Sequence, residues 1–253
     1  MKISRKKIIV AAIAIFITGI LLVVVMIFFD EAILMRQGTF YQGHTREKVV
    51  ALTFDDGPSE VWTPRILDVL RNEDVKATFF LIGNHVTKYP DIVRRIAAEG
   101  HDIGNHTNRH PLLYFLDGGA LKKEIATCQK AIRETTGVTT NLFRPPKAWL
   151  TPHEKRKIQR WGYRIILWTL NSKDWVEFDA KYIVRFIVKN VQPGDIILFH
   201  DSGGAFRSEG GGRQETVIAL QKTISKLREQ GYRFVTITEL LKMENQLEHK
   251  QNP

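Results

Sequence analysis

The chain has 253 residues, of which 43% are hydrophobic, and 37 Lys and Arg against 27 Asp and Glu give a formal net charge of +10. This length suits one domain of about 200 residues with an appendage, and the composition excludes a disordered chain, a collagen-like chain and a small disulfide scaffold. An excess of positive charge is compatible with a protein that binds nucleic acid. No cluster of Lys and Arg with interleaved aromatic residues accompanies it, so we expect no nucleic-acid partner.

The first 29 residues combine a basic start with a long apolar run. Residues 1–7 contain four cations, and residues 8–29 follow without a charge. A helix of that length spans about 30 Å, the thickness of the hydrocarbon core of a bilayer. The pattern predicts a cytoplasmic basic segment over 1–7 and an uncleaved transmembrane signal anchor over 8–29, with a cleaved signal peptide as the alternative. We therefore expect a single-pass protein of the cell membrane that contacts the bilayer through residues 8–29, with its catalytic part outside the cytoplasm.

Regular secondary-structure patterns begin only after residue 46. Residues 30–46 are expected to form a linker, residues 47–244 one domain, and residues 245–253 a polar tail. Strands are predicted at 49–54, 77–82, 102–105, 142–144, 163–168, 196–199 and 233–237, and helices begin at 63, 90, 121, 151 and 215, with a last helix near 240. Strands that alternate with helices predict an α/β fold with a parallel sheet, either a barrel or an open doubly wound sheet. In both, chemistry collects at the carboxyl ends of the strands.

Polar clusters follow the first and third predicted strands. Asp55 and Asp56 precede a Gly-Pro turn, and two adjacent carboxylates there indicate chemistry, although an Asx turn would also explain them. His106 and His110 are spaced i, i+4 and can bind one ion from one face of a turn, unless they are a chance pair on a solvated turn. With one aspartate they form an Asp-His-His site that leaves a position for water, which suits a catalytic Zn²⁺. The other aspartate is then free to act as a base.

Three further clusters follow later strands. Arg144 starts a proline-rigidified loop from which it could pair with the free aspartate. Asp174 and Trp175 follow the fifth strand, and a Trp beside a polar site commonly stacks on a sugar ring. His200 ends the sixth strand, where it is well placed as a general acid. Taken singly, a surface Arg, a packed Trp and a structural His are the competing interpretations.

Together these motifs resemble those of a known family. The segments Thr53-Phe54-Asp55-Asp56-Gly57-Pro58, His106-Thr107-x-x-His110, Arg144-Pro145-Pro146, Asp174-Trp175 and Leu198-x-His200-Asp201 occur in the order found in polysaccharide deacetylases, carbohydrate esterase family four. The resemblance covers roughly residues 48–241. It implies a distorted (β/α) barrel of about seven strands, here preceded by the one transmembrane helix.

The resemblance also implies a metal site and a base. Asp56, His106 and His110 are similar to the family's metal ligands, usually for Zn²⁺, with Co²⁺ or another divalent metal as alternatives. Asp55 resembles the general base that takes a proton from water. Arg144 resembles the residue that orients this base.

A proton donor and a substrate pocket complete what the family implies. His200 resembles the general acid that protonates the leaving amine, and Asp174 the carboxylate that holds it. Trp175 and Leu198 are similar to the residues that wall the acetyl pocket. The backbone N–H of Lys147 stands where the family has an oxyanion donor.

Two departures from the family pattern affect what we expect. Lys147-Ala148-Trp149 stands where an aromatic residue and Gly usually follow, and Asn171 stands where the fourth motif usually starts with Asp. We expect a metal-dependent hydrolase that removes N-acetyl groups from amino sugars of a cell-surface polysaccharide, in the first place peptidoglycan N-acetylglucosamine. The alternative is a catalytically attenuated, deacetylase-like module that only binds glycan. The oligomeric state is left open.

Overall fold

The fold is described from a computed structural model for residues 4–28, 32–176, 179–203 and 210–251. The strands are β1 (Val49–Asp55), β2 (Thr78–Leu81), β3 (Asp102–Asn105), β4 (Leu142–Phe143), β5 (Arg164–Ile165), β6 (Leu170–Asn171), β7 (Asp195–His200) and β8 (Arg233–Val235). The helices are α1 (Arg5–Phe28), α2 (Ala32–Met35), α3 (Trp62–Asn72), α4 (Gly83–Lys88), α5 (Pro90–Ala98), α6 (Gly118–Thr136), α7 (Pro152–Arg160), α8 (Ala180–Asn190), α9 (Gln214–Glu229) and α10 (Ile237–Gln251). Three 3₁₀ turns are η1 (Leu113–Phe115), η2 (Pro146–Ala148) and η3 (Asp174–Val176). The chain divides into two compact units, residues 1–31 and 32–253.

The first unit contains α1. Among the described residues, no helix is both long enough and apolar enough to cross a bilayer. The transmembrane helix expected over residues 8–29 is therefore wrong as part of the fold prediction, and residue 29 itself lies outside the described residues.

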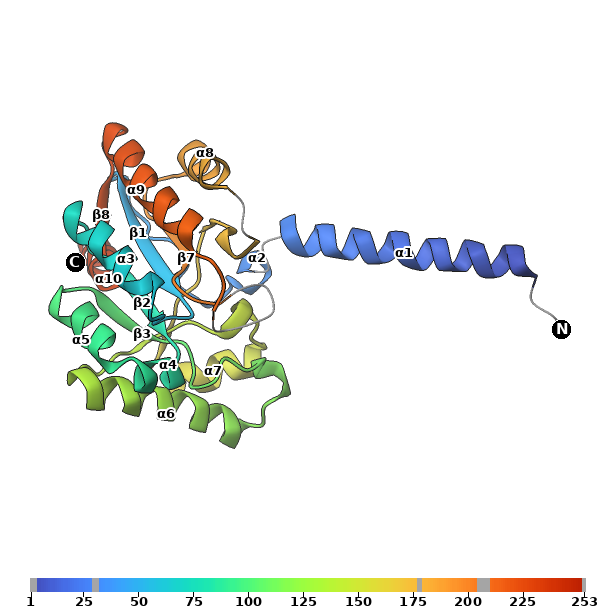
Figure 1. Ribbon diagram of the computed structural model, residues 1–253. Coiled ribbons are helices and arrows are strands. Elements are labelled where there is room, and N and C mark those ends of the chain that lie inside the picture. The colour runs from blue at the N-terminus through green and yellow to red at the C-terminus, as the bar shows by residue number, and fades with distance from the viewer. Residues whose placement is uncertain (1–3, 29–31, 177–178, 204–209, 252–253) are drawn as a thin grey trace. The chain divides into compact units, whose positions relative to one another are not determined.

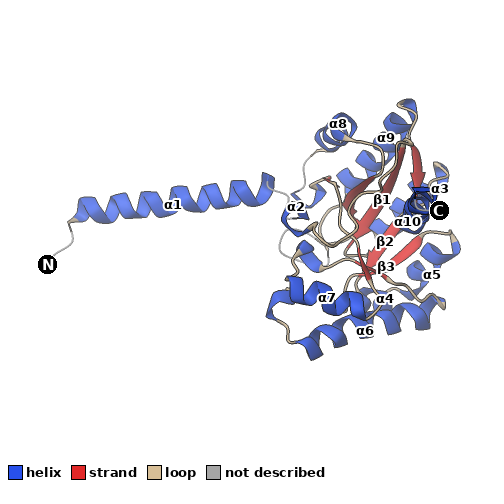
Figure 2. Ribbon diagram, turned by 180° about the vertical axis from the view of Figure 1, so that it is seen from behind, coloured by secondary structure: helices blue, strands red, loops and turns tan. Residues whose placement is uncertain are grey.

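The second unit is built on a parallel sheet with the strand order β5-β4-β3-β2-β1-β7-β6, and β8 pairs with β1 off this path. Figure 1 shows β1 and β7 side by side near the middle, and Figure 2 shows the strands enclosed by α3, α5 and α9 on one side. The α/β class agrees with the sequence. The expected barrel does not close, because no ladder joins β5 to β6 within the described ranges, and the sheet is a half-barrel.

A segment before β1 explains why the half-barrel stays open. Phe40 pairs with the edge of β5 that no strand of the described sheet covers. Its N–H donates to the carbonyl of Ile165, and its own carbonyl accepts from the N–H of Leu167. Two residues on, Gln42 bridges to Asp195 at the start of β7. Residues 32–46, expected to be a linker, therefore contribute backbone pairing and the buried Phe40 side chain to the second unit.

Strand β1 is buried on both faces, as the apolar run in the sequence predicts. Val50, Leu52 and Phe54 pack in the core beneath the helices, whereas Val49 and Ala51 pack in a second core on the inner face of the half-barrel. Because β1 lies between β2 and β7, burial of its two faces anchors the strand end that carries Asp55.

The largest local differences from the sequence prediction lie between residues 163 and 190. The single strand expected at 163–168 is instead the two-residue β5, followed by irregular chain and the short β6. Periodicity also missed α4 and α8. At the C-terminus, α10 continues through the polar segment to Gln251, and residues 252–253 lie outside the described residues.

Candidate active site and metal centre

The candidate site lies at the carboxyl edge of the sheet. Asp55 ends β1 and is in register with Phe80 of β2 on one side and with His200 of β7 on the other. Asn105 ends β3 in register with Phe143 of β4. Parallel strands align their carboxyl ends, so residues far apart in the sequence meet along one edge.

Asp56, His106 and His110 form the candidate metal centre. One possible ligand atom from each lies within 4.8 Å of the others. Asp56 Oδ1 is 3.4 Å from His106 Nε2 and 3.2 Å from His110 Nε2. Two ligands each about 2.1 Å from a tetrahedral ion lie about 3.4 Å apart, so these separations fit one metal ion. The spacing predicts the two histidines with one of the adjacent aspartates, and the family resemblance implies Asp56 as that aspartate.

The backbone around the three candidate ligands is strained at some positions and tightly hydrogen-bonded at others. Asp56, Thr107 and His110 have φ values of 74°, 68° and 57°, in the left-handed region that non-glycine residues rarely adopt. Buried Glu124 of α6 accepts the backbone N–H groups of the two residues before His110, at 3.1 and 2.9 Å. His85 of α4 donates from Nδ1 to the carbonyl of Asp56, at 2.8 Å. None of this support has a signal in the sequence.

Hydrogen bonding selects the free nitrogen of His106. Its Nδ1 donates to the backbone carbonyl of Arg144 at 2.7 Å, which leaves Nε2 directed at Asp56. Such a bond to the second ring nitrogen fixes the tautomer and orientation of a metal-binding histidine. Burial lowers the pKa of His110 to about 4, so its ring is neutral and can donate a lone pair at neutral pH. Burial raises the pKa of Asp56, but the neighbouring His110, His106 and His200 outweigh it and hold that pKa below its ordinary value.

Asp55 and Arg144 form a buried ion pair. Arg144 Nη1 donates to Asp55 Oδ1 at 2.7 Å and to Thr53 Oγ1 at 2.8 Å, and the Arg144 side chain is fully buried. Its other nitrogens donate to backbone carbonyls, and its guanidinium lies 4.0 Å from the centre of the Phe80 ring. Asp55 Oδ2 stands 3.9 Å from His106 Nε2. The carboxylate is therefore held beside the metal cluster with one oxygen not bonded to Arg144.

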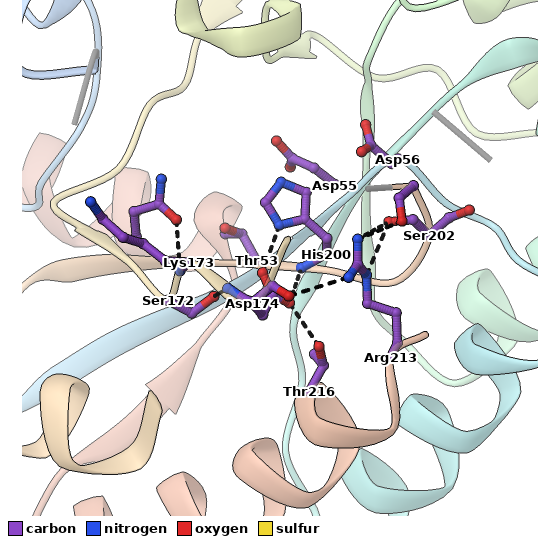
Figure 3. Close-up of polar contacts among 12 residues, drawn as sticks. Thr53, Asp55, Asp56, Ser172, Lys173, Asp174, His200, Ser202, Arg213 and Thr216 are labelled. Atoms are coloured by element: carbon purple, nitrogen blue, oxygen red, sulfur yellow. Dashed lines mark hydrogen bonds and ion pairs between the residues drawn. The ribbon is translucent and has the colours of Figure 1, made fainter. Parts of the chain in front are cut away.

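Asp174 and His200 form a second pair (Figure 3). Asp174 Oδ1 accepts from His200 Nδ1 at 2.8 Å, and Asp174 Oδ2 accepts the backbone N–H of His200 at 2.9 Å. Burial lowers the pKa of His200, but the charge of Asp174 outweighs it, and the net effect raises that pKa above its ordinary value. With Nδ1 bound to a carboxylate, Nε2 is the nitrogen that remains to exchange a proton.

Comparison with known proteins agrees with this geometry. A family model described as polysaccharide deacetylase matches residues 42–166. A peptidoglycan-N-acetylglucosamine deacetylase of Bacillus cereus is 38% identical over 198 residues, which are 78% of this chain and 89% of that protein. The chain belongs to the polysaccharide deacetylase family. This carbohydrate esterase family hydrolyses amides, and the family implied by the sequence motifs is confirmed.

Two other members show how far the family varies. The peptidoglycan-N-acetylmuramic acid deacetylase PdaA of Bacillus subtilis is 31% identical, over 83% of this chain and 78% of that protein. The crystal structure of BA3943, described as a family pseudoenzyme from Bacillus anthracis, superposes with a TM-score of 0.72 at 29% identity, over 79% of this chain and 68% of that one. Membership of the polysaccharide deacetylases therefore leaves the target sugar, and activity itself, to the residues of the site.

The two departures from the deacetylase pattern have distinct structural consequences. Asn171 Oδ1 accepts the backbone N–H of Lys173 at 2.9 Å, so an amide oxygen secures the turn that leads into Asp174. Lys147 and Ala148 have φ values of 55° and 62°, so two side-chain-bearing residues occupy backbone positions that favour glycine.

The pocket residues expected of a deacetylase are dispersed along the same edge. Lys147 in η2 has an exposed side chain, Trp175 in η3 is half-buried, and Leu198 of β7 is buried in the inner core. Leu198 is in register with Thr53 and Asn171, between the two carboxylate-bearing segments. The charge of Lys147 acts on His110, where it lowers the pKa. No hydrogen bond among the described residues joins these three residues to the metal ligands.

Gly57 in the first motif is required by a close approach. A Cβ at Gly57 would lie 2.1 Å from Asp201 Oδ2, far closer than a carbon and an oxygen can approach without a bond. Asp201 is fully buried and accepts from Thr63 Oγ1 at 2.6 Å. Burial raises the pKa of Asp201 to about 7. The glycine therefore lets the turn after Asp56 pass over this carboxyl group.

Proposed function

We propose that this deacetylase hydrolyses the N-acetyl amide of N-acetylglucosamine in peptidoglycan. The observation that carries the proposal is that Asp55 and His200 end adjacent strands beside one Asp-His-His cluster, and that each is bonded to a buried partner of opposite charge type, Arg144 and Asp174 respectively. The name of the B. cereus relative supports this sugar and this polymer. Since peptidoglycan lies outside the cytoplasmic membrane, we propose that residues 47–244 work there as the catalytic domain.

Asp56, His106 and His110 would hold the metal, and their Asp-His-His donor set favours Zn²⁺, with Co²⁺ as the next candidate. A bound divalent metal supplies a Lewis acid that polarises the amide carbonyl and lowers the pKa of water. Asp55 accepts the proton of the attacking water through the oxygen not bonded to Arg144. Arg144 keeps that carboxylate oriented, because its buried guanidinium is itself held by hydrogen bonds to Thr53 and to two backbone carbonyls.

His200 supplies the proton that the leaving nitrogen needs. As the carbon–nitrogen bond breaks, the amine takes this proton and acetate carries the oxygen that came from water. Asp174 holds the imidazole through Nδ1 and stabilises its charged form. We further propose that the backbone N–H of Lys147 stabilises the developing oxyanion, and that Trp175 and Leu198 bound the acetyl group.

The proposal is tested by incubating metal-free, Zn²⁺-loaded and Co²⁺-loaded protein with purified peptidoglycan. Acetate release is measured, and mass spectrometry of wall fragments assigns each lost acetyl group to its sugar. Loss from N-acetylglucosamine only with metal supports the proposal, whereas loss confined to N-acetylmuramic acid reassigns the sugar. Glycan binding without acetate release under every metal would establish a binding module in its place.

The pH profile tests the role of Asp174. The acid must be protonated, so activity is present below the pKa of His200 and is lost as pH rises through it. Asp174 raises that pKa, and Asp174→Asn removes its charge, so the alkaline limb of kcat/KM is expected to move down by about one to three pH units. Asp195→Asn is the matched control, a buried aspartate at the opposite end of β7. An alkaline limb that stays in place in Asp174→Asn would show that His200 is not the titrating acid.

A further inference from the structure

Two buried side chains at the start of α9 reach the Asp174–His200 pair. Arg213 precedes the first residue of α9 and is fully buried, and Thr216 in its first turn is 1% exposed. Figure 3 shows both side chains directed toward Asp174, Thr216 from below and Arg213 from the right, with Asp55 and Asp56 above. Neither residue belongs to the five sequence motifs, and Arg213 follows a glycine-rich segment that carried no functional signal.

Thr216 completes the hydrogen bonding of the Asp174 carboxylate. Its Oγ1 donates to Asp174 Oδ2 at 2.9 Å, the same oxygen that accepts the backbone N–H of His200. With Oδ2 bonded twice, Oδ1 is left to accept from His200 Nδ1. A carboxylate whose two oxygens have different fixed partners cannot rotate, so the imidazole bonded to it is also fixed.

Arg213 ties together the three segments that surround this pair. Its guanidinium donates to the carbonyl of Ser202 through Nε at 3.2 Å and Nη2 at 3.0 Å, and to that of Gly203 at 2.6 Å. It also donates to the carbonyl of Asp174 at 3.3 Å and to that of Gly212 at 3.2 Å. These carbonyls belong to the loop after β7, to η3 and to the start of α9.

A fully buried guanidinium that bonds only to backbone carbonyls is an expensive way to stabilise a fold, because the cation loses its hydration without a directly bonded carboxylate. What the arrangement does provide is geometry. Ser202 and Gly203 follow His200 in the chain, so Arg213 fixes the backbone on both sides of the Asp174–His200 hydrogen bond.

We propose that Arg213 and Thr216 are positioning residues for the proton donor, an inference that rests on the proposed deacetylase function. They hold Asp174 and the chain after His200 so that the His200 imidazole presents a fixed nitrogen to the leaving group. Neither residue touches the reacting atoms in this role.

The leaving group separates positioning of the acid from a structural role. In amide hydrolysis the nitrogen must gain a proton as the carbon–nitrogen bond breaks, whereas the phenolate of an activated aryl acetate leaves as a stable anion without one. In both substrates water supplies the oxygen of the released acetate. Damage to the proton donor therefore lowers the amide rate alone, while general damage to the site lowers both rates.

The experiment measures kcat/KM of Zn²⁺-loaded protein for an N-acetylated chitooligosaccharide and for 4-nitrophenyl acetate. We expect the ratio of the amide to the ester value to fall about tenfold in Thr216→Val and about 10²-fold in Arg213→Met. Thr223→Val is the matched control, because Thr223 is also buried in α9 and its Oγ1 has no partner within the described part of the chain. Arg228→Met, in the exposed last turn of α9, controls for the lost charge. Both controls should keep the ratio of the unaltered chain.

An equal fall of both rates in Thr216→Val and Arg213→Met would overturn the positioning role. If Arg213→Met does not fold, Thr216→Val and Arg213→Lys decide the matter, since lysine keeps the charge but cannot reach three carbonyls with one planar fork. Ester hydrolysis without any amide hydrolysis by the unaltered chain would instead reject the proposed function, and the positioning role with it.

Discussion

Asp55→Asn is expected to lower kcat for amide hydrolysis by about 10³-fold while the protein still binds one equivalent of zinc. An amide side chain keeps the shape of the carboxylate but cannot accept the proton of the attacking water. Asp55 stands beside the cluster, with its Oδ2 3.9 Å from His106 Nε2, and it is not one of the three clustered ligand residues. Removal of the base should therefore leave the metal site able to bind.

Asp56→Asn is the matched variant, because it makes the same change one residue along the chain. Asp56 Oδ1 is the atom that both histidine nitrogens approach, so this variant should lose zinc as well as activity. Metal content after dialysis and kcat with zinc added separate the two aspartates. Zinc loss in Asp55→Asn, or full zinc content in Asp56→Asn, would exchange the proposed roles.

Asp55→Asn also carries a cost in stability that the assay must allow for. Arg144 is fully buried, and without the Asp55 charge its guanidinium keeps only neutral partners. Breaking a buried ion pair by removal of one partner costs about 3–5 kcal/mol. Activity should accordingly be compared at a temperature where denaturation curves show both proteins folded.

His110→Ala is expected to weaken zinc binding by more than about 100-fold, because it removes a ligand rather than a residue that supports one. Zinc stabilises only the folded site, so a free concentration of 100 Kd adds about 2.7 kcal/mol to the unfolding free energy of the unaltered chain. At the same concentration the variant should gain at most about 0.4 kcal/mol. The zinc-induced rise in Tm of metal-free protein measures this difference.

His101→Ala is the control for that measurement. His101 is a buried histidine at the amino end of β3, the strand whose carboxyl end carries His106, and it accepts the backbone N–H of Ala77. Its loss lowers Tm through packing but should leave the zinc-induced rise unchanged. A zinc-induced rise that survives in His110→Ala would remove His110 from the metal site.

Much of the fold follows from short-range pattern. The apolar run at 49–54 corresponds closely to β1, because burial on both faces leaves an almost unbroken apolar signature. The predicted segment 102–105 coincides with β3, although Asp-Ile-Gly-Asn carries only one large apolar side chain. Where strands shrink to two residues, as in β5 and β6, too few side chains remain to show a period, and the prediction merged them. The open half-barrel could not be predicted from local pattern either, because Phe40 pairs with the edge of β5, which lies more than 120 residues further along the chain.

In the candidate site, too, some residues can be predicted from the sequence and others cannot. The Asp-Asp pair and the two histidines are visible in the sequence, because the members of each pair lie within four positions of each other at or just after the end of a predicted strand. The contacts of Arg213 and Thr216 with Asp174 join residues about 40 positions apart, and an Arg after glycines or a Thr in a helix is chemically unremarkable until the partner is known.

The sequence alone predicts the family, which the comparisons confirm, and candidate residues for binding a metal, accepting a proton and donating one. Those properties belong to side-chain chemistry and to the alternation of strands and helices, both of which are local. The tertiary structure decided which aspartate faces the histidines, how the side chain and the carbonyl of Arg144 bond to Asp55 and His106, and what holds Asp174 beside His200. These depend on strand register and on buried hydrogen bonds between distant segments, which form only when the whole sheet is assembled.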